Sequence, residues 1–140
     1  MPTIFTKIIN RDVPAHIVYE DDRFIVFLDI IQATPGHTLV AIKEEFTNIF
    51  DTPDRLLGDF FKLVAKVARA INEAFHPSGV NILSNNGDGA GQTVYHFHVH
   101  LVPRYENDGL NFKLKNHMHE VQSADYIDRA EKIKKTLAQL

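Results

Sequence analysis

Three histidines alternate with apolar residues in the segment 95–102, which reads Tyr-His-Phe-His-Val-His-Leu-Val. Strict alternation with aromatic and β-branched partners predicts a β-strand. Successive strand residues point to opposite faces, so His96, His98 and His100 should share one face of a sheet. The other face should be covered by the apolar partners, which are Tyr95, Phe97, Val99 and Leu101. Neighbouring imidazoles would lie about 6.6 Å apart, close enough for two of them to address one small group.

The length and composition of the chain favour one globular domain, to which we assign residues 1–140. The chain has no cysteine, which excludes disulfides, thiol catalysis and zinc bound by cysteine, and suits a reducing compartment. A net charge of −3 gives no electrostatic reason to expect a nucleic-acid partner. The apolar runs are too short for a membrane span, and the N-terminus lacks a secretory pattern. We therefore expect a cytoplasmic protein that binds neither nucleic acid nor membrane.

The rest of the chain predicts an α+β fold, with an antiparallel sheet, one long helix packed on it, and short helices at both ends. A helix over residues 54–75, capped by Asp51 or Thr52, has apolar side chains at helical spacing. Thr3 can cap a short apolar helix, and Ser123 a final one. Strands are expected over 16–19, 24–28, 37–42 and 80–85. The short connection between the second and third strands should bring Asp29 and His37 to one edge of the sheet.

The histidine segment has three interpretations. It could be a solvent-facing strand with incidental histidines, a zinc site with His37 as a further ligand, or a centre for nucleophilic and acid–base chemistry. A glycine-rich loop over residues 86–93 leads directly into it. Glycines let backbone amides approach an anion closely, and this loop lacks the Gly-Lys-Ser/Thr of a P-loop. Together they suggest a phosphate held beside an imidazole, while metal ligation and nucleophilic attack both stay open.

Residues 85–100 closely resemble the signature of the histidine triad (HIT) family, in which three histidines alternate with other residues and apolar residues follow. The resemblance extends upstream through the segments 3–9, 19–21, 27–30 and 35–40, which look like the Hint branch and its bacterial relatives. It covers residues 3–104, which we take as the domain core. Residues 105–140 form a C-terminal extension that looks more like the prokaryotic form than the short eukaryotic tail.

The resemblance implies a HIT-like fold and a hydrolase with a covalent nucleotidyl-histidine intermediate. By this resemblance His98 is the nucleophile and His100 binds the phosphate and assists the leaving group. His96 orients His98 through its backbone carbonyl, with His37 packed behind it. The implied nucleotide-binding residues are Asp29 for the ribose, Asn85, Gly91, Gln92 and Thr93 for the phosphate region, and Phe5, Ile8, Phe27 and Ile30 for the base.

The resemblance also implies the substrate and the assembly. We expect hydrolysis of purine nucleoside phosphoramidates, of the AMP-lysine or AMP-NH2 type, by a homodimer that uses no cofactor, with the helix 54–75 as a candidate contact. A dinucleoside polyphosphate hydrolase of the Fhit type is an alternative, because segments 90–94 and 103–104 also resemble that branch. A nucleotide-binding regulatory module with little turnover is another.

Two positions depart from the pattern of many bacterial relatives, which carry Cys-x-x-Cys near the N-terminus and bind a structural zinc there. Thr3 and Thr6 stand in place of those cysteines, and Glu45 stands where a histidine ligand is expected. We therefore expect no metal at this position. His117 and His119 form another alternating pair, but they lie in an irregular stretch and we interpret them as surface residues.

Overall fold

The computed structural model describes residues 2–140. The chain divides into two compact units, one that ends at Asp108 and a second from Gly109 to Leu140. Among the described residues, no helix combines the length and the apolar character that a bilayer crossing requires.

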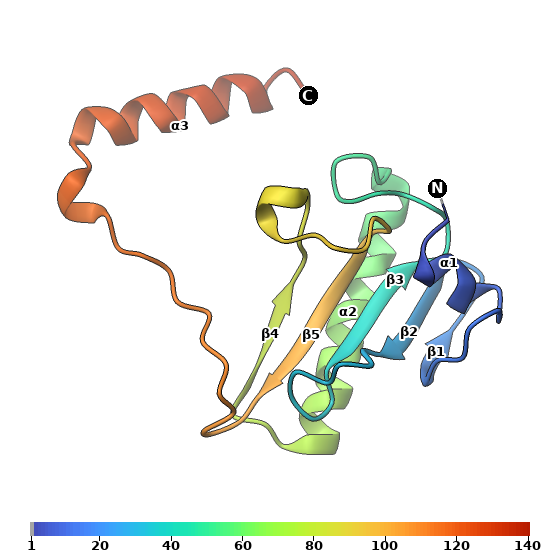
Figure 1. Cartoon of the computed structure of the whole chain (residues 1–140). Helices are drawn as coiled ribbons and strands as arrows, with labels where there is room; N and C mark the ends of the chain where they lie inside the picture. Colours follow the sequence, from blue (N-terminus) through green and yellow to red (C-terminus); the bar gives the residue numbers. More distant parts are fainter. Residues whose placement is uncertain (1) are drawn as a thin grey trace. The chain divides into compact units, whose positions relative to one another are not determined.

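The first unit contains a five-stranded sheet in which every neighbouring pair is antiparallel (Figure 1). The strand order is β1-β2-β3-β5-β4, so the third strand pairs with the fifth in the middle of the sheet. The predicted α+β class with an antiparallel sheet is confirmed. The strands are β1 (Ile17–Glu20), β2 (Phe24–Leu28), β3 (Thr38–Ile42), β4 (Gly79–Leu83) and β5 (His98–Arg104).

Both faces of the central strands are buried, which explains why β2 is a continuous apolar run rather than an alternating one. Phe24 and Val26 face the long helix α2 (Asp54–Phe75), together with Phe97, Val99 and Leu101. Ile25 and Phe27 face the opposite side, where they pack with Phe5 and Ile8 of the short helix α1 (Ile4–Ile9). The sheet is therefore the middle layer between α2 and α1 (Figure 1).

Helix α2 has the predicted bounds and buries one apolar stripe, made of Leu56, Phe60, Val64, Val67 and Ile71. Its predicted caps are wrong. Pro53 occupies the cap position without a side-chain hydrogen bond, because Asp51 instead accepts from the amides of Thr47 and Asn48. Thr52 donates to the carbonyl of Asn48. Helix α1 carries the predicted Thr3 cap, reinforced by Thr6.

The histidine strand starts later than its sequence pattern indicates. β5 begins at His98, so Tyr95, His96 and Phe97 precede it. The side-to-side alternation still holds for Phe97, Val99 and Leu101, which all lie in the core against α2. Tyr95 is an exception, since it is half exposed and its hydroxyl contacts Asp88.

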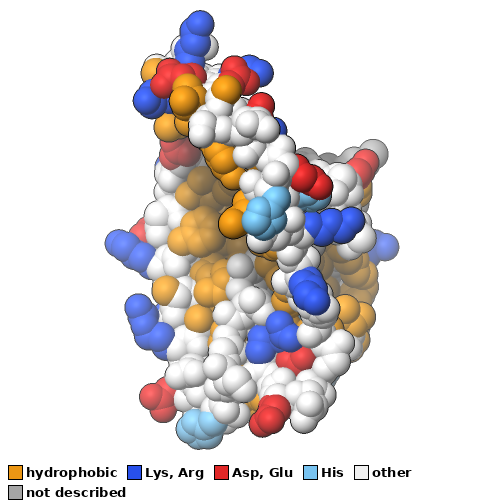
Figure 2. All heavy atoms as spheres, turned by 90° about the vertical axis from the view of Figure 1, so that its left-hand side faces the viewer, with side chains coloured by type: hydrophobic (Ala, Val, Ile, Leu, Met, Phe, Trp, Pro, Cys, Tyr) orange, Lys and Arg blue, Asp and Glu red, His pale blue; other side chains and the backbone are white. Residues whose placement is uncertain are grey.

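The second unit contains a 3-10 turn, Met118–Glu120, and the helix α3 (Ser123–Leu137). The predicted Ser123 cap is wrong, because Gln122 is the cap and forms a capping box with Asp125. No residue from 109 to 140 is buried. The apolar stripe of α3 is exposed at Tyr126, Ile127, Ile133 and Leu137. Figure 2 shows exposed hydrophobic side chains in orange on one face of the molecule.

Two glycines offer a matched test of backbone strain. Gly36 has φ +94, and a Cβ there would lie 3.2 Å from ring atoms of Phe75 and 3.3 Å from Pro103. Gly58 lies within α2, and a Cβ there would meet nothing within 4 Å. Gly36→Ala should lower the free energy of unfolding by about 1–3 kcal/mol. Gly58→Ala should raise it by about 0.5–1 kcal/mol, because alanine favours a helix over glycine. Urea unfolding measures both, and a Gly36→Ala variant as stable as the parent chain would contradict the strain argument.

Candidate active site

Backbone carbonyls hold two of the triad histidines in place. The Nδ1 of His98 lies 2.6 Å from the carbonyl oxygen of His96. The Nε2 of His96 lies 2.5 Å from the carbonyl oxygen of Ile42. A carbonyl can only accept a hydrogen bond, so each of these ring nitrogens must carry its hydrogen. In the neutral form of His98 the other nitrogen, Nε2, is left with a free lone pair.

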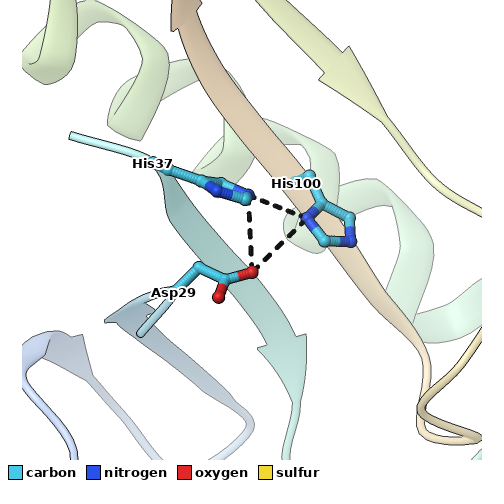
Figure 3. A group of neighbouring side chains, drawn as sticks. All are labelled: Asp29, His37 and His100. Atoms are coloured by element: carbon cyan, nitrogen blue, oxygen red, sulfur yellow. Dashed lines mark hydrogen bonds and ion pairs between the residues drawn. The ribbon is translucent and has the colours of Figure 1, made fainter. Parts of the chain in front are cut away.

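His37 and His100 meet on the same sheet face beside Asp29 (Figure 3). Antiparallel pairing of β2 with β3 brings Asp29 and His37 together, as predicted, and the Asp29 amide donates to the His37 carbonyl at 3.0 Å. The Nε2 of His37 lies 3.0 Å from the Nδ1 of His100 and 3.5 Å from a carboxylate oxygen of Asp29. His37 therefore packs against His100, and its predicted place behind His96 is wrong.

The amide of Ala33 decides which nitrogen of His37 carries the hydrogen. It donates to the His37 Nδ1 at 3.2 Å, so this nitrogen is an acceptor. The hydrogen of neutral His37 is then on Nε2, which donates to the Nδ1 of His100. In neutral His100 the hydrogen must in turn be on its own Nε2. His100 thus offers a donor to a bound group, while His98 offers a lone pair.

The same three residues have the spacing of a metal site. The ligand atoms of Asp29, His37 and His100 are 3.0, 3.5 and 3.9 Å apart. A tetrahedral zinc with bonds of about 2.0–2.1 Å separates its ligands by about 3.4 Å. However, the Ala33 amide keeps the hydrogen on the His37 nitrogen that would have to bind the metal. The spacing fits a metal, but the hydrogen-bond pattern fits an imidazole relay better.

Burial keeps these imidazoles neutral. Burial is the largest cause of a lowered pKa for His37, His96 and His98. The pKa of His100 is lowered to about 4, by burial first and then by the neighbouring His98 and His37. Asp29 opposes the shift at His37, His98 and His100. At neutral pH the four rings are therefore uncharged, and His98 has the lone pair that a nucleophile needs.

A cavity of about 460 Å³ opens beside the histidines, within the usual size range of small-molecule sites. His98, His100 and Asp29 are the polar groups of the site among the residues that line it. The predicted base-binding residues Phe5, Ile8, Phe27 and Ile30 all line it, as does Thr93. Phe5 also stands edge-on to His98, with ring centroids 4.7 Å apart. One cavity is thus lined both by apolar side chains and by His98 and His100.

Gln92 is not in this cavity, so the sequence-based prediction of a phosphate contact is wrong for its side chain. It is buried, and its amide nitrogen donates to the carbonyls of Thr47 and Val94. Its oxygen accepts from the Gly87 amide and from Asn48. Gln92 therefore anchors the glycine loop through its side chain. A glutamine beside glycines gives no sequence signal that separates these two roles.

Asn85 and Gly91 also lie outside the cavity lining. Gly91 has φ +88, and a Cβ there would lie 3.9 Å from the amide nitrogen of Asn85, so the two residues are neighbours. His37 and His96 are buried behind the lining. Both act on the residues that line the cavity, His96 through its carbonyl on His98 and His37 through its ring on His100.

Several lining residues were not expected from the sequence. They come from α1, the segment between α1 and β1, β2, the β2–β3 connection, β3 and the segment before β5: Ile4, Val13, Pro14, Ala15, His16, Leu28, Ile31, Leu39 and Val94. The one sequence feature that could have indicated these residues is the apolar stretch before β1, because it does not belong to the core that packs against α2. The contact of Ala33 with His37 has no sequence signal, because any residue can supply a backbone amide.

At the position where many bacterial relatives are expected to bind zinc, Thr3 and Thr6 have other partners. The Thr6 hydroxyl accepts from the Thr3 amide and donates to a carboxylate oxygen of Glu45 at 2.9 Å. The Thr3 hydroxyl accepts from the amide of Phe5. This hydrogen-bonded link joins α1 to the segment after β3. Hydroxyls and one carboxylate are a poor donor set for structural zinc, which favours thiolate and imidazole.

The fold and the histidine site agree with the result of a comparison with protein-family models. The family model for the HIT domain matches residues 10–107, and the chain belongs to the histidine triad family. It thus has the nucleotide-binding and hydrolase domain of that family.

Individual relatives extend the match beyond the domain. "Protein hit" of Bacillus subtilis is 44% identical over 136 residues, covering 96% of this chain and 94% of the relative. The crystal structure of a HIT family member from the same species has a TM-score of 0.92 at 43% identity and covers 96% of each chain. "Adenylylsulfatase HINT3" of Arabidopsis thaliana is 35% identical over 107 residues, which is 76% of this chain and 54% of that protein.

The depressed pKa of His100 predicts acid instability. As the pH falls below 6.5, His100 gains a proton in the unfolded chain, whereas in the folded chain it stays neutral down to about 4. Proton uptake therefore favours unfolding, and stability falls as the pH falls through this window. In His100→Asn the amide oxygen can accept from His37 without titrating.

Between about pH 7.5 and pH 5 this variant should lose about 1–2 kcal/mol less stability than the parent chain. Urea unfolding at the two pH values measures the difference. Equal losses in both proteins would mean that His100 does not contribute to the acid instability.

Proposed function

We propose that this protein hydrolyses purine nucleoside phosphoramidates through a covalent intermediate on His98. The observation that carries the proposal is the 2.6 Å contact between the His98 Nδ1 and the His96 carbonyl. It leaves the lone pair of His98 on Nε2, and His98 lines one cavity together with Asp29 and a group of apolar side chains. The family membership and the adenylylsulfatase relative support chemistry at a nucleotide phosphate.

The substrate fits this cavity in one orientation. The purine lies in the apolar compartment formed with Phe5, Ile8 and Phe27. The ribose hydroxyls donate to Asp29, since an ionised carboxylate can accept two hydrogen bonds. The α-phosphate then lies between His98 and His100, beside Thr93.

The reaction proceeds in two displacements. The His98 Nε2 lone pair forms a bond to the α-phosphorus, and the bond from phosphorus to the leaving nitrogen breaks as the amine takes a proton from solvent. His98 becomes cationic, and its Nδ1 hydrogen bond to the His96 carbonyl stabilises the charge. The His100 Nε2 hydrogen binds a phosphoryl oxygen and stabilises charge there. Water then attacks phosphorus, a proton goes to solvent, and the nucleoside monophosphate leaves neutral His98.

We further propose that the protein acts in the cytoplasm as a homodimer. β4 is an edge strand of the sheet and carries no proline or charged residue, so its outer edge can pair with another strand. Ile82 on this strand is half exposed, and so are Phe61 and Phe75 of α2. A second copy that pairs along β4 would cover apolar surface of this kind.

Removing the nucleophile should separate chemistry from binding. His98→Ala should lower turnover of a fluorogenic adenosine phosphoramidate by about ten-thousandfold or more. Affinity for AMP should change by less than about threefold, because the apolar compartment and Asp29 remain. His119→Ala, at an exposed histidine of the second unit, is the matched control and should retain full activity.

Turnover and binding measured with the parent chain discriminate between the candidate functions. Absence of turnover with tight AMP binding would favour a regulatory nucleotide-binding module, and faster cleavage of diadenosine polyphosphates would favour the Fhit-type alternative. Loss of activity on adding EDTA would contradict the metal-free scheme.

The ribose assignment has its own test. Asp29→Asn keeps an oxygen that can accept from the Ile31 amide, which Asp29 binds at 3.0 Å, but loses the negative charge. A hydrogen bond to a charged group contributes about 1.5–3 kcal/mol, so AMP affinity should fall by about tenfold to a hundredfold. Titration calorimetry with AMP measures the change, and 2′,3′-dideoxy-AMP is the control ligand. If the variant bound AMP as tightly as the parent chain, the ribose would lie elsewhere.

A further inference from the structure

The loop between β2 and β3 supplies three of the groups that set the geometry of the site. Asp29 follows the end of β2, His37 precedes β3, and the amide of Ala33 lies between them in sequence. This loop is anchored to the sheet side by Thr34, whose buried hydroxyl donates to the Pro103 carbonyl at 2.6 Å. The Thr34 carbonyl also accepts from the His37 amide at 3.1 Å, but neither of these bonds involves Gln32 or Ala33.

Gln32 makes further bonds within the loop through its side chain. Its amide nitrogen donates to the carbonyl of Asp29 at 2.7 Å and to the carbonyl of His37 at 2.8 Å. Its oxygen accepts from the amide of Gly36 at 3.0 Å. Two acceptors face the nitrogen and one donor faces the oxygen, so the orientation of the amide is unambiguous. One side chain thus ties together both ends of the loop.

The backbone at Gln32 is strained, and this points to a specific role. Its φ is +41, in the left-handed region that residues other than glycine and asparagine rarely adopt. Gln32 is an exposed residue, so core packing does not impose this conformation. The three hydrogen bonds are the visible compensation for the strain. The turn at Gln32 carries the chain into Ala33 with its amide directed at the His37 ring.

We propose that Gln32 is a positioning residue, which sets the tautomers of His37 and His100 by holding the Ala33 amide against His37. Without the Gln32 bonds the loop relaxes, and the His37 Nδ1 loses its fixed donor. His37 can then carry its hydrogen on Nδ1, and its Nε2 no longer donates to His100. His100 is then free to place its own hydrogen on Nδ1, away from a bound phosphate. The last step rests on the proposed function, whereas the tautomer of His37 does not.

The test uses the full chain labelled with 15N and long-range proton–nitrogen spectra of the imidazole rings near pH 7.5. These spectra report which ring nitrogen of each histidine carries the hydrogen. In the parent chain, His37 should have it on Nε2. Gln32→Met is nearly isosteric and removes all three hydrogen bonds. It should shift the His37 tautomer ratio by about fivefold to tenfold toward Nδ1, the effect of losing about one hydrogen bond.

Two further variants sharpen the test. Gln32→Glu keeps an acceptor for the Gly36 amide but places an oxygen against two carbonyls, so its tautomer shift should be at least as large. Gln139→Met makes the same substitution at an exposed glutamine near the C-terminus and should leave the spectra unchanged. Phosphoramidate turnover, as kcat/KM, should fall by about fivefold to tenfold in both Gln32 variants.

The outcomes separate this inference from the proposed function. An unchanged His37 tautomer in both Gln32 variants would overturn the positioning role, whatever the activity. A shifted tautomer in proteins that never turn over phosphoramidate would support the positioning role and refute the proposed function. A shifted tautomer with reduced turnover, and no change in Gln139→Met, would support both.

Discussion

The hydrogen bond from His98 to the carbonyl of His96 is the interaction on which the chemistry of this site depends. It lies within one short segment of chain, at the point where β5 begins. The carbonyl accepts from Nδ1 and so fixes the tautomer, the ring orientation and the free lone pair together. A residue two positions earlier in sequence thus determines how a histidine can react. The same carbonyl would stabilise the cationic ring after attack on phosphorus.

The other ring nitrogens are held in the same way, by groups of the main chain. Ile42 supplies a carbonyl to His96, and Ala33 supplies an amide to His37. The His37 Nε2 in turn donates to the Nδ1 of His100 and so fixes the tautomer of that ring. Burial completes the arrangement, because it lowers the pKa of each ring and keeps it neutral. The sheet can bury the histidines because α1 covers this face while α2 covers the other.

Much of the fold was predictable because its signals are periodic. Alternation placed Phe97, Val99 and Leu101 opposite the histidines, and helical spacing gave α2 its bounds. The predicted capping residues of α2 and α3 are wrong, since several neighbouring polar residues could serve as a cap and the loop geometry selects among them. Sequence likewise could not separate the anchoring role of Gln92 from ligand contact. Backbone donors such as the Ala33 amide cannot be predicted from residue types, because almost every residue has the same amide.

The direct test of a covalent intermediate on His98 is the stereochemical course at phosphorus. An adenosine phosphoramidate that carries sulfur in place of one phosphoryl oxygen, with known configuration, would be hydrolysed in water enriched in 18O. Two successive in-line displacements, first by His98 and then by water, each invert the configuration. A covalent intermediate on His98 therefore predicts net retention in the product. Net inversion would show that water attacks the substrate directly, and would contradict the role of His98 as the nucleophile.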